Sequence, residues 1–321
     1  MPRNRKLFIR NQTHFITFRA EEGLPLPPTP VINQILKSVI CKAQSQYPVD
    51  VSAFNFMSNH VHLLATVTDP EVVHEFVQYL KRESAHAINR LLGRRKRTIW
   101  CSGYDSPVIL DVEKAIEQTA YIYTNPQESN LTDTIEQYPG LSSWKMFITG
   151  NYILKAKRIR RTDIKQLNRT NLTLYDYNRL AIELIRDSEE ENVFILTPYA
   201  WFKSFDTDLT QDEAKERIIA RVREKEQEFR STRKTPVVGA YKLQTQDMTI
   251  AHTPKKFGKR MICLSSYKEL RISYIAFFRS LCSEASSLYQ QVKNRVRNIF
   301  ELPPGMFAPG GMLYANVWLA P

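Results

Sequence analysis

The amino-acid sequence predicts an α+β protein, in which an antiparallel sheet with helices on one face is followed by a mainly helical C-terminal region. Two observations support this prediction. Residues 1–150 alternate short β-rich runs with amphipathic helical segments. Residues 151–321 contain two long segments that open with capping boxes and carry apolar residues three and four positions apart. We therefore expect two domains, 1–150 and 151–321.

Local signals define the elements of the N-terminal half. Helices are expected after Thr29, Asp69 and Asp111, because each of these residues can cap a helix and proline follows the first two. Two β-rich runs separated by only two residues predict a hairpin. The expected elements are a strand at 14–19, a helix at 30–46, hairpin strands at 49–57 and 60–67, a helix from 70, an extended segment at 106–110 and a helix from 112 that Pro126 ends.

The C-terminal region is expected to be mainly helical. The capping box of Thr210 and Glu213 opens a charged helix that runs to about residue 230, and the capping box of Ser266 and Glu269 opens a longer one. The second helix has an apolar stripe that either packs in the core or forms a dimer. The stripe consists of Leu270, Tyr274, Phe277, Leu281, Ala285, Leu288, Val292, Val296 and Ile299.

The charge balance favours a polyanionic partner. The chain has 45 Lys and Arg residues against 33 Asp and Glu residues, a net charge of +12. Basic side chains near phosphates release condensed counterions, so such an excess is typical of nucleic-acid binding. The excess is concentrated in two runs, 81–97 and 155–169, which suggests a binding track beside a site.

The cysteines and the apolar runs exclude several classes of protein. Cys41, Cys101, Cys263 and Cys282 lie far apart and form no CxxC pair, which favours reduced thiols over a disulfide framework or a zinc site. The basic N-terminus lacks the apolar core of a secretory signal, and no apolar run is long enough to span a bilayer. We expect a cytoplasmic protein that makes no membrane contact.

A pair of histidines gives the first indication of chemistry. His60 and His62 lie two residues apart on a predicted strand, so their side chains point to the same face while Val61 and Leu63 point to the other. A lone histidine on such a strand is usually a buried core residue. Burying two together costs two polar desolvations, which favours a two-imidazole half of a metal site. Metal-dependent amidohydrolases also use this arrangement, but the other histidines here have no comparable setting.

The helix from residue 112 supplies a complement to the histidine pair. At 100° per residue, Tyr121 falls on the polar stripe of this helix with Asn125 one turn beyond it, whereas Tyr123 falls on the packing face. An exposed tyrosine alone would mean little. The amide oxygen of Asn125 could complete a His-His-Asn metal site beside it.

Three motifs resemble a known family. "MSNHVHLL", "AYIYTNP" and "YPGLSSW" are similar to the single-tyrosine HUH transposases, particularly the REP-associated tyrosine transposases. The resemblance covers residues 10–150 and implies a ferredoxin-like HUH core that acts as a single-stranded DNA transposase or endonuclease domain. Residues 151–321 lie beyond this core and are expected either to bind DNA or to brace it.

The resemblance implies a role for each residue of the candidate site. His60, His62 and Asn125 would bind a divalent metal, Mg²⁺ or Mn²⁺, and Tyr121 would be the nucleophile that forms a 5′-phosphotyrosine link beside a DNA hairpin. The alternative is a domesticated protein that binds structured single-stranded DNA without cutting it. A rolling-circle initiator is disfavoured by the Tyr-x-x-x-Asn-Pro arrangement and by the lack of a P-loop.

The sequence also predicts which residues contact DNA, the oligomeric state of the protein and its location. Trp100 and Tyr104 are candidates for stacking on bases, and Trp144 is expected in the core. A monomer or homodimer associated with the bacterial nucleoid is expected. The basic residues predicted to bind DNA are Lys81, Arg82, Arg94, Arg95, Lys96, Arg97, Lys157, Arg158, Arg160 and Arg161.

Overall fold

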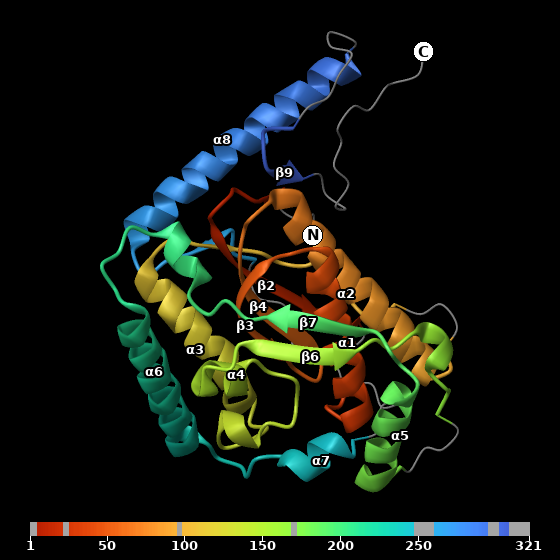
Figure 1. Ribbon diagram of the computed structural model, residues 1–321. Coiled ribbons are helices and arrows are strands. Elements are labelled where there is room, and N and C mark those ends of the chain that lie inside the picture. The colour runs from red at the N-terminus through yellow and green to blue at the C-terminus, as the bar shows by residue number, and fades with distance from the viewer. Residues whose placement is uncertain are drawn as a thin grey trace.

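A five-stranded sheet forms the centre of the protein (Figure 1). The computed structural model describes residues 5–21, 26–94, 98–167, 172–246, 260–294 and 302–307. The strands pair in the order β3-β4-β2-β5-β8, and all neighbours are antiparallel except the parallel pair β5 and β8. The strands are β2 (Thr13–Arg19), β3 (Asp50–Phe56), β4 (His60–Thr66), β5 (Val108–Ile109) and β8 (Cys263–Leu264).

Helices cover both faces of this sheet. Helices α1 (Pro30–Gln46) and α2 (Pro70–Leu91) pack on the face that carries Val61 and Leu63. Helix α3 (Val112–Glu128) packs on the opposite face, which carries Leu64, and α6 (Gln211–Thr232) lies against α3 (Figure 1). The α+β class is confirmed. The sequence predicted helices on one face, but a central strand buried from Val61 to Thr66 requires cover on both.

The predicted local signals match the structure at most helix ends. Thr29, Asp69 and Asp111 each accept hydrogen bonds from backbone N–H groups in the first turns of α1, α2 and α3. Thr210 and Glu213 form the predicted capping box of α6. These caps depend only on neighbouring residues, which explains why the sequence predicts them well.

Pro126 does not end α3, contrary to the prediction, because the helix continues to Glu128. Proline has no N–H group, so the carbonyl of Ile122, four residues earlier, loses its usual helical partner. The side-chain amide of Asn55, on β3, donates to that carbonyl at 3.0 Å. A buried side chain from another element therefore replaces the missing hydrogen bond and lets the helix run on.

Replacing Asn55 with alanine should lower the free energy of unfolding by about 1–3 kcal/mol, because the buried Ile122 carbonyl would then have no donor. Urea unfolding followed by circular dichroism measures this change. Asn178→Ala, at an exposed position on α5, is the matched control and should change stability by less than about 0.5 kcal/mol. Equal effects of the two substitutions would contradict this account of Pro126.

Segments from the C-terminal region pack around the sheet domain. The hairpin of β6 (Ile153–Lys157) and β7 (Glu191–Ile195) lies against α1, and β8 extends the central sheet. Short strands β1 (Lys6–Leu7) and β9 (Met306–Phe307) pair near the two ends of the chain. The remaining helices are α4 (Trp144–Thr149), α5 (Leu174–Arg186), α7 (Ala240–Gln244), α8 (Lys268–Lys293) and the 3-10 turns Ile135–Gln137, Arg161–Asp163 and Ala200–Ser204.

Helix α8 extends away from the rest of the chain (Figure 1). It buries its predicted stripe only in part. Leu270 and Phe277 are exposed by 42% and 44%, whereas Ala285 is buried with Leu7 and Met306. Val296 and Ile299, and the side chain of Val292, lie outside the described residues. The stripe therefore packs against β1 and β9 over part of its length.

Two predicted absences can be compared with the structure. The four cysteines are all free thiols, as the sequence predicted. Within the described ranges, no helix is long and apolar enough to cross a membrane.

One buried histidine makes stability depend on pH. Burial lowers the pKa of His14 to about 4. The hydrogen bond to the Ser106 carbonyl opposes this shift, and the charge of Lys6 adds to it. The unfolded chain takes up a proton near pH 6.5 while the folded chain does not, so stability present above pH 6.5 is lost as the pH falls toward 4. In urea titrations, we expect His14 to remove about 1.4 kcal/mol of stability per pH unit as the pH falls from 6 to 5. His60 and His62, whose pKa values burial also lowers, add to this loss. A flat profile over that window would contradict the prediction.

Candidate active site

The hairpin and helix α3 bring the four predicted site residues together. His60 and His62 project from β4 toward α3, with ring centroids 4.5 Å apart. The Nε2 atom of His60 lies 3.0 Å from the Oδ1 atom of Asn125. The ring centroids of His62 and Tyr121 are 5.4 Å apart. Residues more than 50 positions apart in the sequence therefore form one cluster.

His62 is buried, and its ring nitrogens make no hydrogen bond to the described residues. Its ring stacks on Phe15 with centroids 5.0 Å apart and meets Tyr121 edge-on. Both of its ring nitrogens are buried without a hydrogen-bond partner among the described residues. Burial, followed by the charges of His60 and Arg19, holds the pKa of His62 well below its usual range. The ring is therefore neutral at pH 7 and keeps a lone pair, as a metal ligand must.

His60 and Asn125 face each other as two acceptors. His60 Nδ1 lies 2.6 Å from Asn59 Oδ1, so this nitrogen carries the proton and donates it. Burial lowers the pKa of His60 to about 4, against the opposing effect of Asn125. The neutral ring then has its lone pair on Nε2, directed at the carbonyl oxygen of Asn125. His60 Nε2 and Asn125 Oδ1, which lie 3.0 Å apart, could therefore both bind one cation.

The geometry of the donor set fits a divalent metal. Adjacent ligands of an octahedral ion with bonds of about 2.1 Å lie about 3 Å apart, which agrees with the separation of His60 Nε2 and Asn125 Oδ1. No group of three or more His, Cys, Asp and Glu side chains that could hold a metal occurs in the described parts of the chain. A metal at this cluster would therefore need the amide oxygen of Asn125 beside the two imidazoles.

Tyr121 lies at the edge of the cluster and is half-buried. Its ring packs on Phe15 with centroids 5.9 Å apart. Burial and the charge of Glu128 raise its pKa, while a hydrogen bond with Asn125 and the charge of Arg19 oppose that increase. Tyr123, two residues along, is fully buried and bonds to Ser143 at 3.0 Å, as predicted for the packing face.

Arg19 belongs to the cluster, although the sequence did not single it out. It pairs with His60 across the β2–β4 ladder, and Thr17 pairs with His62. Directly opposed residues of antiparallel strands point to the same face, so the guanidinium of Arg19 is on the side of the histidines. Its charge affects the pKa of His60, His62 and Tyr121. The position of Arg19 in the cluster follows only from the register of β2 on β4, which the sequence alone does not give.

The two basic runs meet in the structure. Arg161 bonds to Glu83 on α2 at 2.7 Å, and Arg90 Nε donates to the carbonyl of Ile164 at 3.0 Å. The backbone N–H of Leu167 donates to the Leu91 carbonyl at 2.8 Å. The described parts of the two runs are therefore one surface region, beside the face of the sheet that α1 and α2 cover.

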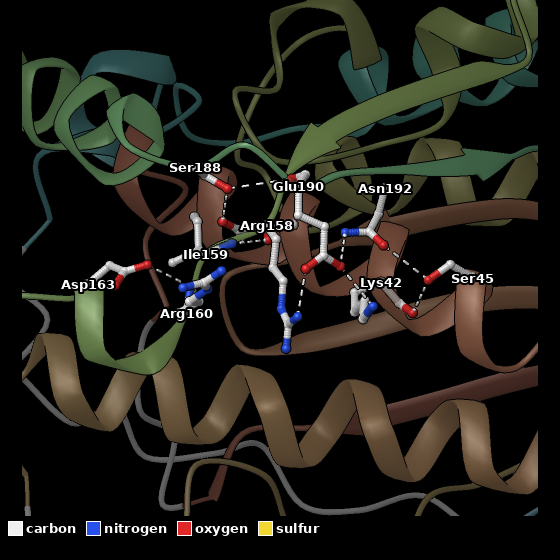
Figure 2. A network of polar contacts seen from close by, with 10 residues as sticks. Lys42, Ser45, Arg158, Ile159, Arg160, Asp163, Ser188, Glu190 and Asn192 are labelled. Carbon is white, nitrogen blue, oxygen red and sulfur yellow. Dashed lines mark hydrogen bonds and ion pairs between the residues drawn. The ribbon is translucent and has the colours of Figure 1, made fainter.

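Carboxylates neutralise part of that region. Figure 2 shows Arg158 and Lys42 on either side of Glu190, at 2.6 and 2.9 Å. Their hydrogen bonds hold the pKa of the Glu190 carboxyl at about 2. Arg160 is exposed beside this network, and its backbone N–H donates to Asp163 (Figure 2). The region is less cationic than the sequence alone suggested.

The other predicted DNA contacts have varied settings. Lys81 is only 8% exposed and donates to the carbonyls of Cys101 and Gly103. Arg82 pairs with Glu83 at 3.0 Å, Lys157 is exposed, and Arg94 follows the end of α2. Arg95, Lys96 and Arg97 lie outside the described residues. Trp100 and Tyr104 are as buried as Trp144, at 4–5% exposure, so they offer no open stacking surface.

Comparison with known proteins agrees with this cluster. Residues 27–125 match the family described as IS200-like transposases, and this span includes both histidines, Tyr121 and Asn125. This part of the chain is similar to IS200-like transposases. The matched span contains the first of the three motifs and the second as far as Asn125, and the match supports a transposase role that acts on DNA.

Curated proteins and solved structures give little further information about the chain. No curated protein matches the chain. Among solved structures, it is similar to a REP-associated tyrosine transposase bound to a REP hairpin, with 18% sequence identity and a TM-score of 0.39. That similarity covers 46% of this chain and 86% of the other.

Proposed function

We propose that this protein is a metal-dependent endonuclease and strand transferase for single-stranded DNA, with Tyr121 as its nucleophile. One observation carries the proposal. Two neutral imidazoles and an amide oxygen converge beside a tyrosine hydroxyl in a domain that matches IS200-like transposases.

The reaction we propose is a transesterification at a phosphodiester. The Tyr121 oxygen would attack phosphorus, the bond to the 3′ oxygen would break, and the phenol proton would leave to solvent while the 3′ oxygen takes one up. The products would be a 5′-phosphotyrosine link and a free 3′-hydroxyl. Attack by such a hydroxyl on the phosphotyrosine reverses the step and joins strands.

His60, His62 and Asn125 would hold the metal, Mg²⁺ or Mn²⁺. When bound, the ion supplies Lewis-acid polarisation of the scissile phosphate. Mixed imidazole and amide donors suit Mn²⁺ at least as well as Mg²⁺, which prefers oxygen ligands. Asn59 fixes the tautomer of His60, and Phe15 fixes the plane of the His62 ring.

Arg19 would position the scissile phosphate, because its guanidinium shares the face of His60. Arg19→Gln should reduce the single-turnover rate of adduct formation about 10- to 100-fold without a change in melting temperature. Arg10→Gln is the matched control, because Arg10 is an exposed arginine that bonds to the Thr68 carbonyl away from the cluster. Equal rates for the two variants would remove Arg19 from the proposal.

The substrate we propose is single-stranded DNA beside a hairpin, and its backbone would follow exposed basic residues such as Lys157 and Arg160. We propose residues 1–150 as the catalytic domain. Residues 151–321 would brace it, since β6 and β7 pack on α1 and α6 packs on α3. A DNA substrate fits a bacterial nucleoid location.

The test is incubation of the full-length protein with labelled hairpin oligonucleotides, including a randomised pool, in Mn²⁺, Mg²⁺ or chelator. A covalent protein–DNA adduct that requires metal supports the proposal. Binding without any adduct across the pool would instead support a protein that binds structured single-stranded DNA without cutting it.

A further inference from the structure

A second candidate site lies on the opposite face of the central sheet from His60 and Tyr121. His14 neighbours Phe15 on β2, but its side chain points the other way, into a cavity of about 360 Å³. This volume falls in the range of about 300–1,000 Å³ that is typical of small-ligand sites. Segments from both ends of the chain enclose it, including residues 5–7 and 260–262, which lie outside the matched transposase span.

The wall of the cavity is cationic. Arg5, Lys6, Lys81 and Arg260 line it, and Asp105 is the one carboxylate among the described lining residues. Asp105 is paired with Arg260 at 3.6 Å. A cavity with such an excess of positive charge favours an anion.

Two buried polar atoms of the lining residues have no hydrogen-bond partner in the described structure. They are Nη1 of Arg5, which is a donor, and Nε2 of His14. The other ring nitrogen of His14 faces the carbonyl of Ser106 at 3.0 Å and must donate to it, so Nε2 carries a lone pair and is an acceptor. Burying a polar group without a hydrogen-bond partner costs free energy. A ligand that forms hydrogen bonds with both atoms would therefore gain binding free energy here.

The rest of the wall includes aromatic side chains, of which Trp100 and Tyr104 are almost fully buried. Tyr274 and Phe278 from α8 line the cavity, with Trp100 and Tyr104 from the loop that follows α2. The ammonium of Lys6 lies over the Tyr104 ring, 3.4 Å from its centroid. An inorganic anion would use the cations but not the rings. An anion without an O–H group, such as sulfate, would also leave the acceptor of His14 without a donor.

We propose that this cavity binds a nucleoside phosphate, with the phosphate at Arg5 and a hydrogen-bond donor of the base or sugar at His14 Nε2. The ligand is either a free mononucleotide or a nucleotide of a DNA strand. The site is separate from the candidate active site, so the inference holds whether or not Tyr121 cleaves DNA.

Calorimetric titration of the full-length protein tests the proposal. The probes are the four deoxynucleoside monophosphates, deoxyadenosine, inorganic phosphate and an unphosphorylated single-stranded oligonucleotide. At least one monophosphate, or the oligonucleotide, should bind, and Arg5→Met should weaken that binding about tenfold or more. Arg10→Met is the matched control, because Arg10 is exposed outside the cavity, and it should change binding less than twofold.

The outcomes separate the two sources of ligand. A monophosphate that binds and that the oligonucleotide does not displace identifies a free nucleotide, whereas Arg5-dependent binding of the oligonucleotide identifies DNA. Phosphate and deoxyadenosine should each bind more weakly than the nucleotide that joins them. Binding that Arg5→Met leaves unchanged overturns the proposal, as does the absence of any binding.

A second measurement uses the wild-type protein, so its result does not depend on whether Arg5→Met folds. In ¹⁵N-labelled protein, the Nε2 resonance of His14 should shift when the bound probe donates a hydrogen bond to it. An unchanged resonance at saturating probe would overturn the assignment of His14, whatever the behaviour of Arg5→Met.

Discussion

Tyr121→Phe should abolish the covalent protein–DNA adduct, with a fall of at least about 10³-fold in the rate of cleavage. The substitution removes only the oxygen that we propose as the nucleophile. The ring keeps its contacts with Phe15 and His62, so the cluster should persist. Affinity for the hairpin oligonucleotide, measured by fluorescence anisotropy, should remain within about threefold of wild type, because a single phenol contributes little to binding a polyanion.

Tyr123→Phe is the matched control on the same helix. Tyr123 is buried, and its hydroxyl bonds to Ser143 at 3.0 Å. We expect this variant to lose about 1 kcal/mol of stability and to form the adduct at the wild-type rate. An adduct that survives Tyr121→Phe and disappears in Tyr123→Phe would contradict the proposed nucleophile.

His62→Ala should remove the dependence of cleavage on metal together with most of the activity, about 10²-fold or more. The side chain contributes two buried, unpartnered ring nitrogens and no hydrogen bond that holds the fold. Binding of Mn²⁺ to the protein without DNA, followed by electron paramagnetic resonance, gives a readout that does not rely on activity. We expect wild type to bind one ion at the cluster and the variant to lose it.

His86→Ala controls for the loss of any imidazole, because His86 is exposed on α2. Asn125→Ala should resemble His62→Ala, since the amide oxygen faces His60 at 3.0 Å. If His62→Ala binds Mn²⁺ as tightly as wild type, these residues are not the ligands.

Features that depend on neighbouring residues could be predicted from the sequence. The caps at Thr29, Asp69 and Asp111 and the hairpin that carries His60 and His62 are local, and the structure contains all of them. The side of α3 that Tyr121 and Tyr123 occupy follows from helical periodicity alone. Sequence reasoning therefore located the candidate site within one hairpin and one helix.

Features that depend on distant residues could not be predicted. Helix α3 passes Pro126 because Asn55 donates to the Ile122 carbonyl from another element, and no local signal records that contact. Arg19 joins the cluster only through the register of β2 on β4. Arg158 was predicted as a DNA contact, but Glu190, 32 residues away, pairs with it. Strand pairing and charge pairing at long range were the missing information.

The measurement that tests the central claim most directly is identification of the residue and the DNA end in the covalent adduct. The protein would be incubated with Mn²⁺ and hairpin oligonucleotides labelled at either end, then digested and sequenced by fragmentation mass spectrometry that separates Tyr121 from Tyr123. We predict a phosphonucleotide on Tyr121, with the 3′ label on the protein and the 5′ label released with a free 3′-hydroxyl. A phosphonucleotide on another residue, or a 5′ label retained on the protein, would contradict the mechanism proposed for Tyr121.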